Sequence, residues 1–186
     1  MEKLPLSIFD DTTCWRDPNA KSIGFFAAGP VSSVDQSLLA ELKDMAIQSG
    51  ENVRLSLHEN KDAAFHEMII VQHRDRFHPP KKHSQKAKSF HVMEGEMAVF
   101  SFEDDGKVTN ALALDGQNSF IFRAEKNVYH ADFPITELVV HHESTLGPYL
   151  GDSDSEYPNW APLLDDQGPL IRYRDELFAE YNMDRA

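Results

Sequence analysis

The chain has 186 residues, and 41% of them are hydrophobic, which is enough to bury the core of one domain. Its formal net charge of -13 argues against binding to nucleic acid or an anionic membrane through bulk electrostatics. A lone cysteine, Cys14, excludes an internal disulfide, and no apolar run approaches the ~18 residues of a membrane span. Because residues 1–10 also lack the apolar run of a signal peptide, we expect a cytoplasmic protein without nucleic-acid or membrane partners.

The first part of the chain predicts an extension followed by one helix. Prolines and glycines punctuate residues 1–33, which we expect to drape over the core. Ser33 followed by Gln36 resembles a capping box, and apolar residues at helical spacing continue over 34–49. Gly50 stands where helices commonly end, so the spacing predicts a helix over 34–49.

Between residues 53 and 147 the pattern changes to short strands. Apolar residues alternate with polar ones at a period of two, and Gly, Asn and Asp separate the runs. Glu94-Gly95 is typical of a tight hairpin turn. The expected strands cover 53–57, 68–71, 89–93, 97–102, 108–114, 119–123, 128–131 and 135–142. Many short strands with such turns predict an all-β sandwich or barrel, which with the preceding helix makes up residues 34–150.

Residues 151–186 are predicted to form a C-terminal tail that packs on the barrel. An acidic loop comes first, and Trp160 is expected to anchor the tail. A helix follows, with Pro169 in its first turn. Its apolar face consists of Leu170, Tyr173, Leu177, Phe178 and Tyr181.

Two blocks of the sequence resemble the motifs of the cupins. HPPKKHSQKAKSFHVMEGE, which begins at residue 78 and contains the Gly95 turn, resembles the first motif. EKNVYH at 125–130, which ends in an aromatic residue and histidine, resembles the second, and SFHVMEGEMAVFSFEDDG at 89–106 continues the first block. Together with VRLSLHEN, HHESTLGPY and NWAPLL, they are similar to the WbuC-type cupin family, found beside surface-polysaccharide synthesis genes in bacteria. The resemblance extends over residues 38–162. It implies a cupin double-stranded β-barrel, or jelly roll, with an N-terminal helix and a C-terminal helical tail, and a role in polysaccharide metabolism.

The resemblance also implies where a site lies. In cupins two histidines one residue apart, a glutamate and a later histidine hold a divalent metal such as Zn, Fe, Mn or Ni. Alignment on Gly95 assigns these positions to Lys81, His83, Lys88 and His130. Two of the four are lysines, and an ammonium group repels a divalent cation.

One hypothesis keeps the metal. The chain would then be a metal-dependent cupin enzyme of the isomerase, epimerase or oxygenase type, with His83 and His130 as ligands. Water or another histidine would complete the coordination shell. The further candidate ligands are His78, His91, His141 and His142. On a regular strand, His91 points away from position 88, whereas either His141 or His142 must face inward.

The favoured hypothesis uses the lysines and treats the metal site as degenerate. Residues 73–88 carry six basic side chains against one acid, which predicts a pocket for a small anionic metabolite, such as a sugar phosphate. Lys81 and Lys88 would contact this ligand, with His83 and His130 as hydrogen-bond partners or, in an enzyme without metal, as the general base. Because they alternate away from these positions, Lys82 and Lys86 are expected to be solvated.

A structural role is the remaining alternative. Cupins often pair through edge strands, which hides those edges from solvent. We therefore expect a homodimer, with the N-terminal extension and the C-terminal helix as the natural packing elements.

Overall fold

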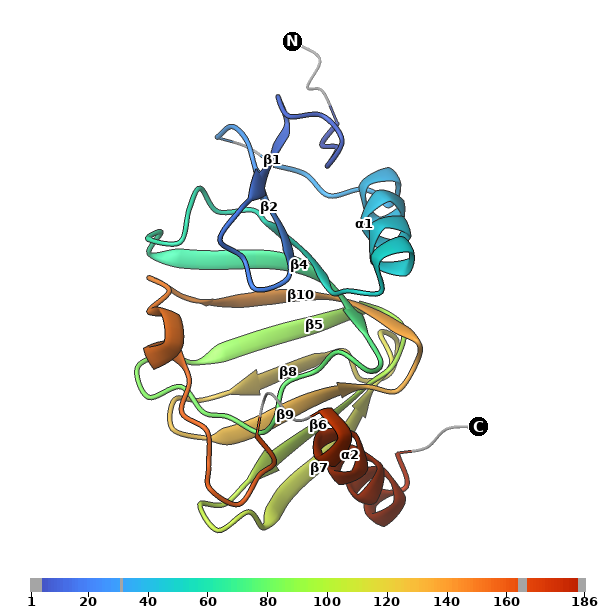
Figure 1. The fold of residues 1–186 in the computed structure, drawn as a ribbon, viewed down its shortest axis with the longest axis vertical. Helices are drawn as coiled ribbons and strands as arrows, with labels where there is room; N and C mark the ends of the chain where they lie inside the picture. The colour runs from blue at the N-terminus through green and yellow to red at the C-terminus, as the bar shows by residue number, and fades with distance from the viewer. Residues whose placement is uncertain (1–4, 31, 164–166, 184–186) are drawn as a thin grey trace.

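The computed structural model describes residues 5–30, 32–163 and 167–183 (Figure 1). Within these residues the larger sheet has seven strands in the order β1-β2-β3-β4-β10-β5-β8. Their bounds are β1 (Cys14–Asp17), β2 (Ile23–Ala27), β3 (Val53–Ser56), β4 (Phe65–His73), β10 (Leu138–Leu146), β5 (Lys88–Glu94) and β8 (Ile121–Ala124). The smaller sheet has the order β7-β6-β9, with β7 (Val108–Leu114), β6 (Met97–Phe102) and β9 (Tyr129–Pro134).

The inner faces of the two sheets enclose an apolar core. Alternate side chains along each strand point inward, so the inner residues of a strand are two apart. The buried residues that meet there are Phe90, Val92, Met97, Val99, Leu114, Phe122, Ala124 and Val139. The fold is therefore the all-β cupin double-stranded barrel, or jelly roll, that the sequence predicts.

Two residues with positive φ shape the turns that the motifs contain. Gly95 joins β5 to β6 at φ 82°, and a Cβ atom there would lie 2.5 Å from the carbonyl oxygen of Leu138. Asn127 has φ 64° in the turn before β9. Asparagine is one of the few residues that tolerate this region, so the turn survives without the glycine that the motif usually has.

The first helix, α1 (Gln36–Ser49), begins at a different cap from the predicted one. The N-cap is Asp35, whose carboxylate accepts a hydrogen bond from the backbone N–H of Leu38, so the predicted role of Ser33 is wrong. The helix ends as predicted, with Gly50 in the left-handed region. Its buried face packs with β2, β3 and β4 on the outer side of the larger sheet.

The C-terminal tail covers the other sheet. The helix α2 (Gln167–Tyr181) buries Leu170, Leu177 and Phe178 against the outer face of β6 and β9, which confirms the predicted apolar face. Before it, the indole of Trp160 packs on the rings of Phe102 and Tyr129, so it anchors the tail.

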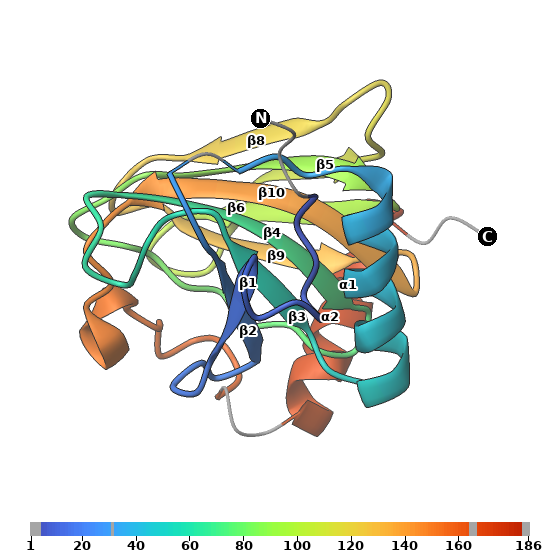
Figure 2. The ribbon, with the colours of Figure 1, turned by 90° about the horizontal axis from the view of Figure 1, so that it is seen from above.

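The helices and the short 3-10 turn η1 (Gly151–Asp154) occupy opposite sides of the molecule. Both views show α1 and α2 on one side of the barrel and η1 on the other (Figures 1 and 2). The N-terminal strands β1 and β2 extend the larger sheet, with β2 parallel to β3. In the part of the chain that the structure describes, no helix is long and apolar enough to cross a membrane.

Candidate functional site

Beyond the apolar core, the inner faces of β9 and β10 carry polar residues. His130 and Asp132 pair with Ser101 and Val99 of β6, and Val99 belongs to the core, so this face of β9 points inward. On β10, His141 and Glu143 follow the core residue Val139 at a spacing of two. Strand alternation therefore brings two histidines and two carboxylates into one interior.

The first residue of β5 supplies a buried ion pair to this interior. The Lys88 ammonium lies 2.9 Å from the Glu143 carboxylate, and the two side chains are only 9% and 13% exposed. Burial alone raises the pKa of Glu143, but the charge and hydrogen bond of Lys88 outweigh it and lower that pKa to about 2. Burial lowers the pKa of Lys88, whereas Glu143 and Asp132 raise it above its ordinary value. Both groups are charged at neutral pH.

A short antiparallel bridge to β9 positions Lys81. Its backbone N–H donates to the carbonyl of His130 at 3.0 Å, and the His130 N–H donates back at 2.9 Å. Paired residues of a bridge face the same side, so Lys81 shares the inner face of His130. The neighbouring Lys82 faces the other way, with its ammonium 4.5 Å from the ring centroid of Tyr129. The inward position of Lys81 and the outward position of Lys82 agree with strand alternation.

Two charged groups of the interior have no direct partner. Among the described residues, none makes a hydrogen bond or ion pair with the Lys81 ammonium or the Asp132 carboxylate. Burial and then the charge of Lys88 lower the pKa of Lys81 to about 8. Burial raises the pKa of Asp132, but Lys88 and Lys81 overcome this and hold it below the ordinary value.

His83 and His130 lie close together, with ring centroids 5.7 Å apart. Nδ1–H of His130 donates to the carbonyl of Val128 at 2.9 Å, and its buried Nε2 has no partner among the described residues. Nδ1–H of His83 donates to the carbonyl of Asp154 in η1. With these tautomers, the Nε2 atom of each ring carries the lone pair.

Burial keeps both rings neutral near pH 7. It lowers the pKa of His130 to about 4, with the charge of Lys88 as the next cause. It also lowers the pKa of His83. Each ring therefore presents an acceptor, and not a cation, to whatever occupies the interior.

The donor set does not fit a resident metal ion. Within the described ranges, no three His, Cys, Asp or Glu side chains are arranged to hold one. Of the further candidate ligands, His141 is buried on the inner face, whereas His91 is exposed beside Phe120. His78 has an exposed surface but lies near Lys81, whose charge, followed by burial, lowers the pKa of His78 to about 3, so this ring does not complete a cation site. The ammonium of Lys88 also neutralises Glu143, the acid that would otherwise bind a cation.

The basic segment 73–88 does not form an open cationic surface, because acids from elsewhere in the fold pair with it. The Lys86 ammonium lies 2.5 Å from the Asp154 carboxylate, and both side chains are 9% exposed. The expectation that Lys86 is solvated is therefore wrong. Arg76 pairs with Glu51 at 2.9 Å. Lys81 and Arg74 have no such carboxylate partner among the described residues, but Arg74 donates to the carbonyl of Ile135, whereas the Lys81 ammonium has no acceptor.

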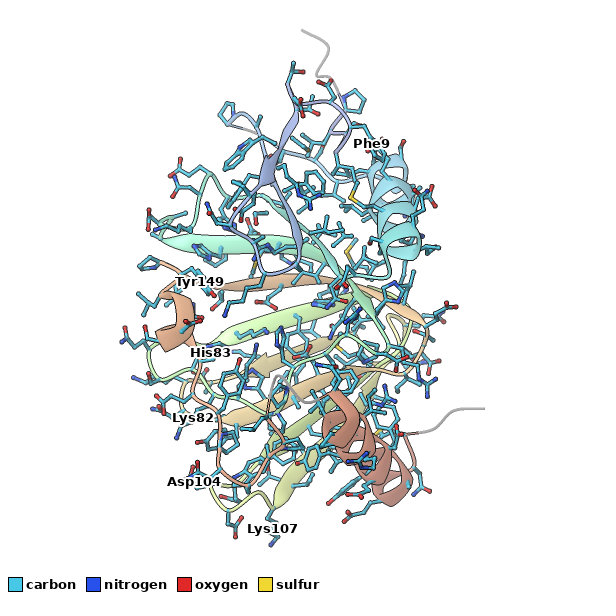
Figure 3. All side chains as sticks on the ribbon, in the orientation of Figure 1. Phe9, Lys82, His83, Asp104, Lys107 and Tyr149 are labelled. Atoms are coloured by element: carbon cyan, nitrogen blue, oxygen red, sulfur yellow. The ribbon has the colours of Figure 1, made fainter. Side chains whose placement is uncertain are left out.

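A cavity of ≈ 230 Å³ lies beside this end of the barrel. Its lining includes Lys86 and Asp154, so the pair that holds η1 in place also borders the cavity. The other lining residues are Ser84, Gln85, Leu146, Gly147, Pro148, Leu150 and Ser153. His83 and Lys82 lie on the same side of the molecule as Tyr149 (Figure 3). The cavity is adjacent to the candidate site through His83, whose Nδ1–H donates to Asp154, but Lys81, Lys88 and His130 are not among its lining residues.

Sequence reasoning missed three acids of the site. Asp132 and Glu143 were detectable, because each follows an inward histidine of its strand at a spacing of two. Asp154 carried no such signal. It belongs to a turn whose position depends on how the tail folds back on the barrel.

Comparison of the sequence with known proteins assigns no activity. A family model described as a domain of unknown function (DUF6016) matches residues 34–114. No curated protein matches the chain.

Similar solved structures include cupin proteins. An L-ribose isomerase from Cellulomonas parahominis has 16% identity, with 64% of this chain and 73% of that chain covered and a TM-score of 0.48. The cupin domain of Schizosaccharomyces pombe Cnp3 has 15% identity, coverages of 50% and 59%, and a TM-score of 0.40. KdgF from Halomonas sp. has 14% identity, coverages of 54% and 82%, and a TM-score of 0.43.

Other similar structures are much longer than the matched part. The chain covers 22% of procruciferin, an 11S globulin from Brassica napus, and 52% of an HTH_3 family transcriptional regulator from Vibrio cholerae. At identities of 11% and 19%, these likenesses concern the fold and not the ligand.

Proposed function

We propose that the chain binds a small polar metabolite of the sugar or sugar-phosphate type at the polar end of the barrel. In this proposal the site is lined by Lys81, Lys88, His83 and His130, which are the residues expected from the sequence, together with Asp132. A place in polysaccharide metabolism is part of the proposal, and it rests on the resemblance to WbuC-type cupins alone.

One observation carries the proposal: the interior presents polar groups that the described residues leave unpartnered. The Lys81 ammonium, the Asp132 carboxylate and the His130 Nε2 atom belong to neighbouring inner-face positions. Burying an atom such as His130 Nε2 without a partner costs on the order of 1–3 kcal/mol, so a core built for stability alone would pair or replace it. A ligand with several hydroxyl groups supplies both donors and acceptors to this set.

The charged side chains of the site also restrict the charge that the ligand can carry. Glu143 already neutralises Lys88, so Lys81 is the ammonium that remains for an anionic group. The carboxylate of Asp132 disfavours a second anionic group nearby. The best match is therefore a sugar with at most one anionic substituent, oriented with that substituent toward Lys81 and its hydroxyls toward Asp132 and His130.

Thermal-shift and calorimetric titration with a panel of sugars, sugar acids and sugar phosphates test this function. Lys81→Glu is expected to abolish the binding of whichever compound stabilises the wild type. Lys82→Glu is the matched control, because it makes the same charge change one residue away on the outer face, and it should retain binding. Equal affinity in the wild type and both variants would refute the proposed site.

Elemental analysis of untagged protein tests the competing metal hypothesis. The wild type is compared with the His83→Ala/His130→Ala double variant. Near-stoichiometric metal that disappears in the double variant would overturn the assignment of a metal-free site. Metal-free wild-type protein that binds a sugar as tightly as protein with added metal supports it.

A further inference from the structure

Lys81 differs in its surroundings from the other basic side chains of residues 73–88. Lys86 and Lys88 each have a carboxylate within 3 Å, and Lys82 packs on an aromatic ring. Lys81 faces the barrel interior without an acceptor among the described residues, and it keeps partial solvent exposure. An amine that is shielded from acceptors but still reachable is suited to attack a ligand.

We propose that Lys81 forms an imine with a carbonyl compound that enters the barrel, such as the open-chain form of a sugar. This inference deepens the proposed function and rests on it, because the carbonyl compound must first bind at the polar end of the barrel. It adds covalent chemistry that a site for reversible binding does not need.

The placement of the two inner lysines favours one of them as the nucleophile. Glu143 holds Lys88 as an ammonium ion, and that fixed positive charge disfavours protonation of Lys81. Burial acts in the same direction and more strongly, and the pKa of Lys81 falls to about 8 from the ordinary 10.5. Lys81 therefore has a larger neutral fraction at pH 7 than an ordinary lysine.

The reaction needs proton transfers but no oxidant or reductant. The neutral Nζ atom of Lys81 forms a bond to the carbonyl carbon, and the carbonyl π electrons move to the oxygen, which gains a proton. Nitrogen loses a proton, and the resulting carbinolamine then expels its hydroxyl group, after protonation, as water. The products are the imine and one water molecule.

The neighbouring groups supply the proton transfers. Nε2 of His130 is an unpartnered acceptor on the residue bridged to Lys81, so it is placed to take the proton from nitrogen. Asp132 lies two residues further along the same inner face and interacts electrostatically with Lys81. Its negative charge stabilises the cationic carbinolamine and the protonated imine.

Reductive trapping with glyoxylate, a small anionic aldehyde, and sodium cyanoborohydride at pH 7 tests the inference on the wild type. Peptide mapping then compares the adduct at Lys81 with that at the buried, paired Lys88 and the exposed Lys126. We expect at least about ten-fold faster labelling of Lys81 than of Lys126, because its larger neutral fraction outweighs the lower nucleophilicity of a weaker base. Lys88 should remain unlabelled.

Variants confirm the assignment and guard against general effects on folding. Lys81→Met should lose the fast adduct, whereas Lys82→Met should retain it, with circular dichroism confirming that both fold. If the labelling rates of the lysines follow their solvent exposure, and Lys81 is labelled no faster than Lys126, the proposal that Lys81 forms an imine is wrong.

Failure of the imine is distinguishable from failure of the binding site. Gluconate has no carbonyl group that forms an imine, so its binding depends only on the charges and hydrogen bonds of the site. Gluconate binding that Lys81→Glu abolishes, together with no selective trapping, refutes the imine and leaves the binding site supported. Selective trapping at Lys81 supports the imine directly.

Discussion

The Lys88–Glu143 pair gives the interior its most measurable energetic feature. The pKa of Glu143 falls from an ordinary 4.5 to about 2, and this shift corresponds to about 3 kcal/mol of folding free energy. The side chains are 9% and 13% exposed, so solvent screening reduces this figure little. Glu143→Gln should therefore lower the free energy of unfolding by about 3 kcal/mol at pH 7, because it leaves a buried ammonium unpaired.

Urea denaturation of a double-mutant cycle measures this pair. Lys88→Met alone should also destabilise the fold, because it leaves a buried carboxylate, whereas the Lys88→Met/Glu143→Gln double variant should recover about 2 kcal/mol of the summed losses.

The dependence on pH provides the second arm of the test. The folded-state pKa of Glu143 is depressed, so its stabilisation is complete above about 4.5 and is lost as the pH falls toward about 2. The stability gap between the wild type and Glu143→Gln should therefore narrow below about pH 4.5. A gap under about 1 kcal/mol at pH 7, or one that stays constant as the pH falls, would refute the reasoning.

Urea denaturation also tests three further features. The pKa of His130 is lowered to about 4 in the folded protein, so between about pH 6.5 and pH 4 the unfolded chain binds a proton that the folded chain does not. The wild type should therefore lose stability relative to His130→Gln as the pH falls through this range. Stabilities of the two proteins that change in parallel with pH would contradict this prediction. Asp35→Ala should cost about 1 kcal/mol through loss of the cap, and Ser33→Ala should cost almost nothing; the reverse order would restore the cap expected from sequence. Gly95→Ala should lower the free energy of unfolding by more than about 2 kcal/mol, because φ is 82° and the new Cβ atom would meet a carbonyl oxygen. Asn127→Gly should change the free energy of unfolding by less than about 0.5 kcal/mol, because glycine also tolerates a positive φ. Equal losses in the two variants would contradict this reasoning.

Much of the barrel could be predicted because its signals are local. A period of two marks a strand wherever it lies in the fold, and Gly95 marks a turn through its backbone requirement alone. The start of α1 was harder to place, because Ser33 and Asp35 are both good caps and the choice depends on the path of the incoming chain. Local signals thus identify elements better than they identify where an element begins.

The site was predictable only where regular strand geometry holds. Lys81 and Lys82 follow the alternation because they belong to a bridge with β9 and with the tail. Lys86 lies in the loop before β5, where no period fixes its direction, and it turns inward to meet Asp154. A count of charges along the sequence could not show that a carboxylate 68 residues away would neutralise it.

The same reasoning explains why the segment 73–88 looked like an anion-binding surface. Its basic residues are adjacent in sequence, but their partners come from separate elements: Glu143 from β10, Asp154 from η1 and Glu51 from the turn after α1. Only contacts formed on folding reveal that Lys81 keeps an ammonium without such a partner.

The contact between His83 and η1 makes the tail part of the chemistry of the barrel. Nδ1–H of His83 donates to the carbonyl of Asp154, and this bond selects the tautomer whose Nε2 atom is the acceptor. In a chain that ends before η1, the imidazole loses this constraint, and the proton can occupy either nitrogen. The C-terminal tail therefore does more than cover the barrel, because its docking decides whether His83 offers its neighbours a lone pair or an N–H group.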